Sequence, residues 1–241
     1  MSETEKMIET NETDWNVRET EQEQDVLIGK IKKIGFALIA VLAIGLGYYF
    51  YTGMQETNNE EAMTALSRIS SYYETGQFQK ALDGDPSRSI RGGKVMGLKA
   101  IVSEYGGTSA GSFAALYAGT SLMNLGKFSE AMPYFETAAG SAYETVSAGG
   151  KAGMAACKEE MNSYEEAASL YEAAAGPKDG PMYERYTLFA ALNYEKASAG
   201  GSGSAKEKAI SLLKGLVTKN AGSEYTTEAK MGLARLGWHE N

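Results

Sequence analysis

The chain has 241 residues, which is enough for one well-packed core and additional segments. Its 23 basic and 31 acidic residues give a formal net charge of −8, which argues against a nucleic-acid-binding protein because no basic excess can displace counterions from phosphates. Cys157 is the only cysteine, so we expect no disulfide within the chain and no metal site built from two or four cysteines. We expect no cofactor.

The N-terminal residues 1–29 hold nine acidic and two basic residues, with almost no aliphatic side chain before Val26. A segment that is charged and poor in apolar side chains cannot bury enough surface to offset the entropy of folding. We therefore predict a disordered acidic tail. Trp15 is its only aromatic residue, and it is either a docking residue or part of a solvated tail.

An uncharged run of 18 residues extends from Ile34 to Tyr51. Such a run can span a bilayer core of about 30 Å. Lys30, Lys32 and Lys33 precede it, and the positive-inside rule then predicts that residues 1–29 are cytoplasmic and that residues 56–241 lie outside. We expect residues 30–55 to be an uncleaved transmembrane anchor with a basic flank. A cleaved signal peptide is the main alternative, but signal peptides begin with a short basic region and not with an acidic one.

Two segments between Ser112 and Gly176 repeat each other. LGKFSEAMPYFETAA (residues 125–139) aligns without a gap on MNSYEEAASLYEAAA (residues 161–175), so matched positions lie 36 residues apart. This spacing resembles the roughly 34-residue period of tetratricopeptide repeats. Small residues would let paired helices approach closely, and aromatic residues would fill the space between units. The positions expected to do this are Gly119, Phe128, Ala131 and Phe135 in the first copy and Ala155, Tyr164, Ala167 and Tyr171 in the second. A generic alanine-rich bundle is the alternative.

Helical periodicity continues on both sides of the two copies and predicts an all-α, tetratricopeptide-like solenoid after the anchor. The segment TGQFQKALDG (residues 75–84) matches the repeats once more, but the sequence Asp83-Gly84-Asp85-Pro86 shortens its second helix. A helical stripe is expected from Val95 to Tyr105, and a flexible linker from Ser198 to Ala205. Capping boxes predict helix starts at Thr57/Glu60, Ser141/Glu144, Ser163/Glu166 and Ser204/Glu207.

The acidic tail, the single anchor and the outside repeat domain together resemble the YfgM-like family of bacterial inner-membrane proteins. The stretch GLKAIVSEYGGTSAGSFAALYAG (residues 97–119) is similar to that family's link between its first unit and its first full repeat. The resemblance implies a periplasmic scaffold beside the secretory translocon that passes exported chains to chaperones. The segment LLKGLVTKNAGSEYTTEAKMGLARLG also resembles repeats of outer-membrane assembly and cell-division coordinators, so an adaptor of that kind is the alternative.

One motif favours an enzyme. Residues 107–111, GTSAG, fit the G-x-S-x-G nucleophile elbow and resemble that of patatin-type lipases, with Ser109 as nucleophile. The elbow requires a preceding strand, whereas this segment has helical periodicity. The nearest candidate for the required acid is Asp179, followed by Gly180-Pro181, and the only histidine is His239 near the end of the chain. We therefore expect no enzyme and no catalytic residue, and we interpret Ser109 as a helix N-cap.

The concave face of a helical solenoid usually binds peptides. In the aligned register this face is apolar, and its positions are Phe113, Leu116, Thr120, Met123, Ala152 and Ala156. Gly119 would lie on the opposite, packing side. We expect either a partner-binding groove for unfolded or helical protein segments, or a groove filled by another helix of the same chain.

Overall fold

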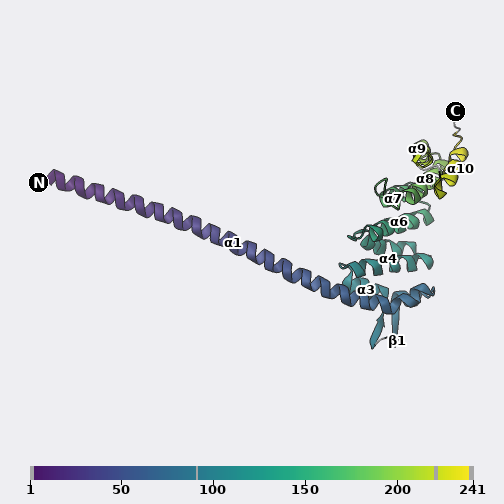
Figure 1. The fold of residues 1–241 in the computed structure, drawn as a ribbon, viewed down its shortest axis with the longest axis horizontal. Helices are drawn as coiled ribbons and strands as arrows, with labels where there is room; N and C mark the ends of the chain where they lie inside the picture. The colour runs from purple at the N-terminus through teal and green to yellow at the C-terminus, as the bar shows by residue number, and fades with distance from the viewer. Residues whose placement is uncertain (1–2, 91, 220–221, 239–241) are drawn as a thin grey trace. The chain divides into compact units, whose positions relative to one another are not determined.

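The computed structural model describes residues 3–90, 92–219 and 222–238, with side chains described for residues 32–33, 35–36 and from 38 onward within those ranges. The chain divides into two compact units, Met1–Met54 and Gln55–Asn241. Helix α1 (Glu3–Glu74) supplies the described part of the first unit and the beginning of the second (Figure 1).

The first unit is helical from Glu3, which differs from the disordered tail expected for residues 1–29. These residues include many Glu and Gln, which favour helices, and no proline precedes Pro86. The helix of the apolar run can therefore continue through the acidic segment before it. The side chains of Trp15 and Lys30 lie outside the described residues.

Apolar side chains cover the described part of residues 34–51 and point outward. Phe36, Leu42 and Phe50 expose 74%, 65% and 71% of their surfaces. By length and composition, α1 is the one helix within the described residues that could cross a membrane, and the side chains of its candidate segment are not buried. A helix that is apolar all round matches a lipid environment better than water.

The second unit is built of helices that pack in chain order. After α1 come α2 (Phe78–Asp83), α3 (Leu98–Tyr105), α4 (Ser109–Asn124), α5 (Phe128–Ala139), α6 (Glu144–Glu160), α7 (Tyr164–Ala175), α8 (Tyr183–Ala199), α9 (Gly203–Lys219) and α10 (Glu224–Arg235). From α3 onward each helix packs against the next, and α4 also contacts α2 and α6. Figure 1 shows the successive helices from α4 to α10 stacked in layers.

A two-stranded antiparallel sheet interrupts the helices, which the sequence analysis did not predict. Strands β1 (Gly84–Ile90) and β2 (Gly93–Met96) pair so that Ile90 lies opposite Gly93. The helical stripe expected from Val95 is therefore wrong at its beginning, because Val95 lies in β2. Pro86 cannot sit in a helix interior, and Gly92 adopts a positive φ of 78° in the turn between the strands. These residues favour the hairpin over a continued helix.

Four helices of the second unit end in the same turn. A residue with positive φ follows each of α1, α4, α6 and α10, namely Gly76, Gly126, Asn162 and Gly237. The next residue donates its backbone N–H to a carbonyl five positions back, for example Lys127 to Leu122 at 2.9 Å and Ser163 to Lys158 at 2.8 Å. This Schellman geometry satisfies the last carbonyls of each helix. It also sets the start of α2, α5 and α7, which each begin with an aromatic residue two positions after the turn residue.

Among the fully buried side chains of the described residues, that of Phe135 in α5 is the largest, and 1% of its surface is exposed. Two glycines lie against the same Cδ1–Cε1 edge of its ring. A Cβ atom added at Gly119 of α4 would lie 2.8 Å from the ring, and one added at Gly153 of α6 would lie 2.3 Å from it. Tyr171 of α7 is buried in the same way with Ala155 of α6. Ala131 and Ala167 are fully buried, and Phe128 and Tyr164 are partly buried beside the turns.

The capping boxes differ from expectation. Thr57 and Glu60 lie inside α1, so no helix begins there. Ser163 precedes α7, but its ψ of 62° is set by the Schellman turn, and its side chain makes no capping bond. A capping serine normally needs an extended backbone to reach the N–H groups of the first turn.

The remaining two predicted starts are displaced by a few residues. The Ser141 hydroxyl accepts a hydrogen bond from the N–H of Tyr143 at 3.2 Å, before α6 begins. Ser204 lies inside α9, where Ser202 instead accepts from the N–H of Ala205 at 3.4 Å. The expected linker from Ser198 to Ala205 is therefore only residues 200–202, because the small residues on both sides are accommodated within α8 and α9.

Candidate functional site

The six residues predicted to line a groove lie on α4 and α6, and each is partly buried. Leu116 packs towards α6, since a Cβ atom at Gly149 would lie 3.3 Å from its methyl group. The ring of Phe113 lies 6.1 Å from that of Tyr143. The Thr120 hydroxyl donates to the Leu116 carbonyl at 2.8 Å, and the partly buried side chains of Met123, Ala152 and Ala156 complete the set. That these residues form a partner groove stays a prediction.

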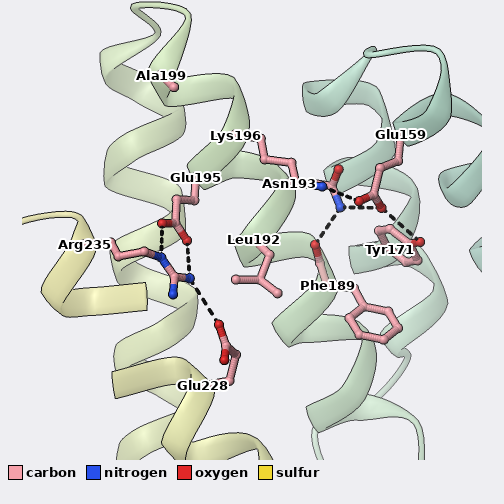
Figure 2. Close-up of a pocket in the computed structure, with 10 residues that line it drawn as sticks. All are labelled: Glu159, Tyr171, Phe189, Leu192, Asn193, Glu195, Lys196, Ala199, Glu228 and Arg235. Atoms are coloured by element: carbon pink, nitrogen blue, oxygen red, sulfur yellow. Dashed lines mark hydrogen bonds and ion pairs between the residues drawn. The ribbon is translucent and has the colours of Figure 1, made fainter. Parts of the chain in front are cut away.

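A cleft lies further along the chain, between α6, α7, α8 and α10. It has a volume of about 670 Å³ and is lined by the residues drawn in Figure 2. Sequence reasoning missed it, although the signal was present. Leu192 stands 36 residues after Ala156, and Glu195 stands 36 residues after Glu159. The repeat spacing therefore extends the predicted groove positions onto α8.

One side of the cleft is organised around Glu159 of α6, whose carboxylate accepts three hydrogen bonds. Lys196 donates to Oε1 at 2.6 Å, and Asn193 and the Tyr171 hydroxyl donate to Oε2 at 3.0 and 3.4 Å. Burial would raise the pKa of Glu159, but the hydrogen bonds from Lys196 and Asn193 and the charge of Lys196 outweigh burial and hold the pKa below its ordinary value. Glu159 is therefore a carboxylate at neutral pH.

Asn193 of α8 is the most unusual residue in the cleft, because only 2% of its surface is exposed. Its amide nitrogen is satisfied by Glu159 and by the Phe189 carbonyl at 3.0 Å. Its Oδ1 atom is buried and accepts no hydrogen bond from the described residues. A buried acceptor without a donor costs about 1–3 kcal/mol. Rotating the Asn193 amide by 180° would not remove this cost, because the nitrogen would then lose the two hydrogen bonds that it donates to Glu159 and to the Phe189 carbonyl.

The other side of the cleft is an ion-pair cluster between α8 and α10. Arg235 donates to both oxygens of Glu195 at 2.6 and 2.9 Å, and to Glu228 at 3.2 Å. The hydrogen bonds to Glu195 raise the pKa of Arg235, so the guanidinium stays charged. This two-point contact ties the last described helix to α8 and forms the wall opposite Glu159, with Leu192 between the two clusters (Figure 2).

Ser109 does not lie on a nucleophile elbow. It is the first residue of α4, and the element before it is helix α3 and not a strand. The expectation that Ser109 caps the helix is wrong by one position, because Thr108 is the cap. The Thr108 hydroxyl accepts a hydrogen bond from the N–H of Gly111 at 3.0 Å. Thr108 has the extended backbone that a cap requires, with ψ of 165°. His239 lies outside the described residues.

Cys157 of α6 is fully buried in the main hydrophobic cluster. Burial, together with the charge of Glu160, raises the pKa of its thiol to about 11. The thiol is therefore protonated at neutral pH and behaves as a small core side chain.

Comparison of the chain with protein-family models, with curated proteins and with solved structures found no match. The resemblance to the YfgM-like family therefore rests on the residues quoted above.

Proposed function

We propose that this chain is a single-pass membrane protein whose residues 56–241 form a tetratricopeptide-like scaffold that binds other proteins. Three features support the repeat architecture. The turns after α1, α4 and α6 share one backbone geometry, and each is followed by an aromatic residue that begins the next helix. Phe135 and Tyr171, which are 36 residues apart, each pack against small residues of neighbouring helices.

The observation that carries the binding function is the cleft between α6, α7, α8 and α10. It combines an apolar surface at Leu192 and Phe189 with hydrogen-bonding groups on both sides. Sites that bind ligands are concave and largely apolar, with a few polar groups that fix orientation. The buried Asn193 oxygen without a donor is the kind of group that a ligand would satisfy.

The proposed setting is the bacterial inner membrane, with residues 1–29 cytoplasmic and the scaffold in the periplasm. The exposed apolar surface of α1 supports an anchor. The lysines that precede the apolar run support the orientation. In this setting the scaffold serves the secretory translocon and passes exported clients to chaperones, as the resemblance to the YfgM-like family implies.

Site-specific photocrosslinking of the full chain in membranes tests the binding function. A photoreactive residue at Leu192 of the cleft should give adducts with a translocon subunit, a periplasmic chaperone or an exported client. Met231 of α10 is a matched control, because it is apolar and 48% exposed but does not line the cleft. A photoreactive residue at Leu116 tests the second groove. The proposal fails if neither Leu192 nor Leu116 gives protein adducts above the level seen at Met231.

Protease added to spheroplasts tests the orientation separately. It should digest residues beyond about 55 and leave the N-terminal segment intact. A protected C-terminal domain would place the scaffold in the cytoplasm and contradict the proposed setting.

A further inference from the structure

The charges around the cleft do not cancel. Glu159, Glu195 and Glu228 contribute three negative charges, and Lys196 and Arg235 contribute two positive ones, so the lining carries one excess negative charge. An occupant with a positive charge is therefore favoured over one with a negative charge. A carboxylate on the occupant would find no free cation in the lining, because Lys196 and Arg235 are both paired with glutamates of the cleft.

The Asn193 oxygen adds a second and independent requirement, because it needs a hydrogen-bond donor. A Lys ammonium or an Arg guanidinium supplies donors and has no acceptor. In Figure 2 the Asn193 oxygen lies at the opposite end of the amide from the nitrogen that donates to Glu159. A cation at this position would satisfy the oxygen and also approach Glu159.

Lys196 occupies the Glu159 side of this position, without donating to the Asn193 oxygen. Its ammonium lies 2.6 Å from Glu159, and its side chain is 48% exposed. An ion pair whose lysine is exposed to solvent contributes little to stability. Lys196 can therefore turn outward and give Glu159 and Asn193 to a cation from a partner.

The apolar part of the cleft limits the occupant further. Leu192 lies between the two charge clusters (Figure 2), and the ring of Phe189, which also lines the cleft, packs against that of Tyr171 at 5.4 Å between ring centroids. An apolar side chain next to the cation would cover both. We propose that the cleft binds an extended polypeptide segment in which an apolar side chain neighbours Arg or Lys, with the cation held by Asn193 Oδ1 and Glu159. This inference rests on the proposed protein-binding function and defines the class of its partner.

Fluorescence anisotropy with the full chain in a non-ionic detergent tests the inference. The probe is a fluorescein-labelled Gly/Ser peptide carrying Leu and Arg side chains, and its twin carries Glu in place of Arg. We expect the Arg peptide to bind about 10-fold more tightly than the Glu twin, since one reversed charge near several fixed charges changes affinity on that scale. Equal affinity for the two peptides would overturn the inference.

Two variants that change one charge each should shift the affinity in opposite directions. Lys196→Gln removes the competing cation and should tighten the Arg peptide about 3-fold, whereas Glu228→Gln should weaken it about 3-fold. Lys206→Gln on α9 and Glu136→Gln on α5 make the same changes at exposed positions outside the cleft and should have no effect. If Lys196→Gln weakens binding, Lys196 is itself a contact, and the assignment of its position to the ligand cation is wrong.

The outcomes separate this inference from the proposed function. Crosslinks from Leu192 without preference for the Arg peptide would leave the scaffold function in place and refute the basic, apolar partner class. Absence of crosslinks from both Leu192 and Leu116, together with absence of peptide binding, would refute both.

Discussion

The packing of Phe135 against two glycines leads to a prediction about Gly153. A Cβ atom at this position would lie 2.3 Å from the Cδ1 and Cε1 atoms of the Phe135 ring. Carbon atoms in favourable contact are about 3.5–4.0 Å apart. The ring cannot move away freely, because Phe135 is 1% exposed and Gly119 of α4 also lies close to its Cδ1 and Cε1 atoms. Gly153→Ala should therefore overpack the interface between α5 and α6.

The expected cost can be separated from the intrinsic preference of alanine for helices. Alanine in a helix interior is favoured over glycine by about 1 kcal/mol. Gly215 of α9 is the matched control, because it also lies inside a helix and a Cβ atom there would meet nothing within 4 Å. Gly215→Ala should thus stabilise the domain by about 1 kcal/mol. Overpacking costs about 1–3 kcal/mol, so Gly153→Ala should be less stable than Gly215→Ala by that amount.

Urea unfolding of the full chain in detergent, followed by far-ultraviolet circular dichroism, measures both variants. A third variant, Phe135→Leu, tests whether the Phe135 ring is the group that the added methyl group would contact. Phe135→Leu should destabilise the wild-type chain, but it should cost much less when Gly153→Ala is already present, because the smaller side chain leaves room for the added methyl group. If Gly153→Ala and Gly215→Ala have the same stability, or if the Phe135→Leu cost does not depend on residue 153, the packing derived for this interface is wrong.

Three further predictions use the same unfolding assay or a simple labelling reaction. Thr108→Ala should lower the free energy of unfolding by about 1 kcal/mol, because the N–H of Gly111 loses its cap, whereas Ser109→Ala should change it little; the reverse order would restore Ser109 as the cap. The pKa of Glu159 is lower in the folded chain than in the unfolded one, so its contribution to stability is present above the unfolded pKa of about 4.3 and is lost as the pH falls through the folded value. Urea unfolding between neutral pH and pH ~3 should therefore show a loss of stability that is smaller in Glu159→Gln, and an unchanged pH dependence in that variant would exclude Glu159 as a source. The Cys157 thiol, with its pKa raised to about 11, should react with a maleimide at neutral pH only after urea unfolding. Rapid labelling of the native chain would contradict its burial.

Much of the helical structure could be predicted from the sequence because its signals are local. The 36-residue spacing predicted matching positions in α4 to α7, and Phe135 and Tyr171 are both buried. The apolar run at residues 34–51 likewise predicted a helix able to cross a membrane, since its length and lack of charge need no tertiary context. Spacing along one chain segment is sufficient for both inferences.

The hairpin was missed because the residues that favour it do not form an alternating apolar pattern. Serine, arginine and glycine dominate β1 and its turn, so the periodicity that reveals strands is absent. Its position depends on contacts with α1, where the Tyr72 hydroxyl donates to Asp85 at 2.8 Å. The predicted cap of α4 was likewise wrong by one residue. Thr108 and Ser109 both have a hydroxyl that can cap a helix, and only the backbone angles distinguish them.

The cleft was the feature that could least be predicted from the sequence, because it is formed by residues that only the tertiary structure brings together. Its Glu159, Asn193 and Arg235 come from α6, α8 and α10, and the bonds from Asn193 to Glu159 and from Arg235 to Glu195 join residues that are 34 and 40 positions apart. The repeat spacing identifies the face on which Leu192 lies, but it does not show which carboxylate pairs with which cation. Those pairings leave the Asn193 oxygen without a donor. An unsatisfied acceptor exists only once every neighbouring donor has been assigned a position in space, which no local pattern can supply.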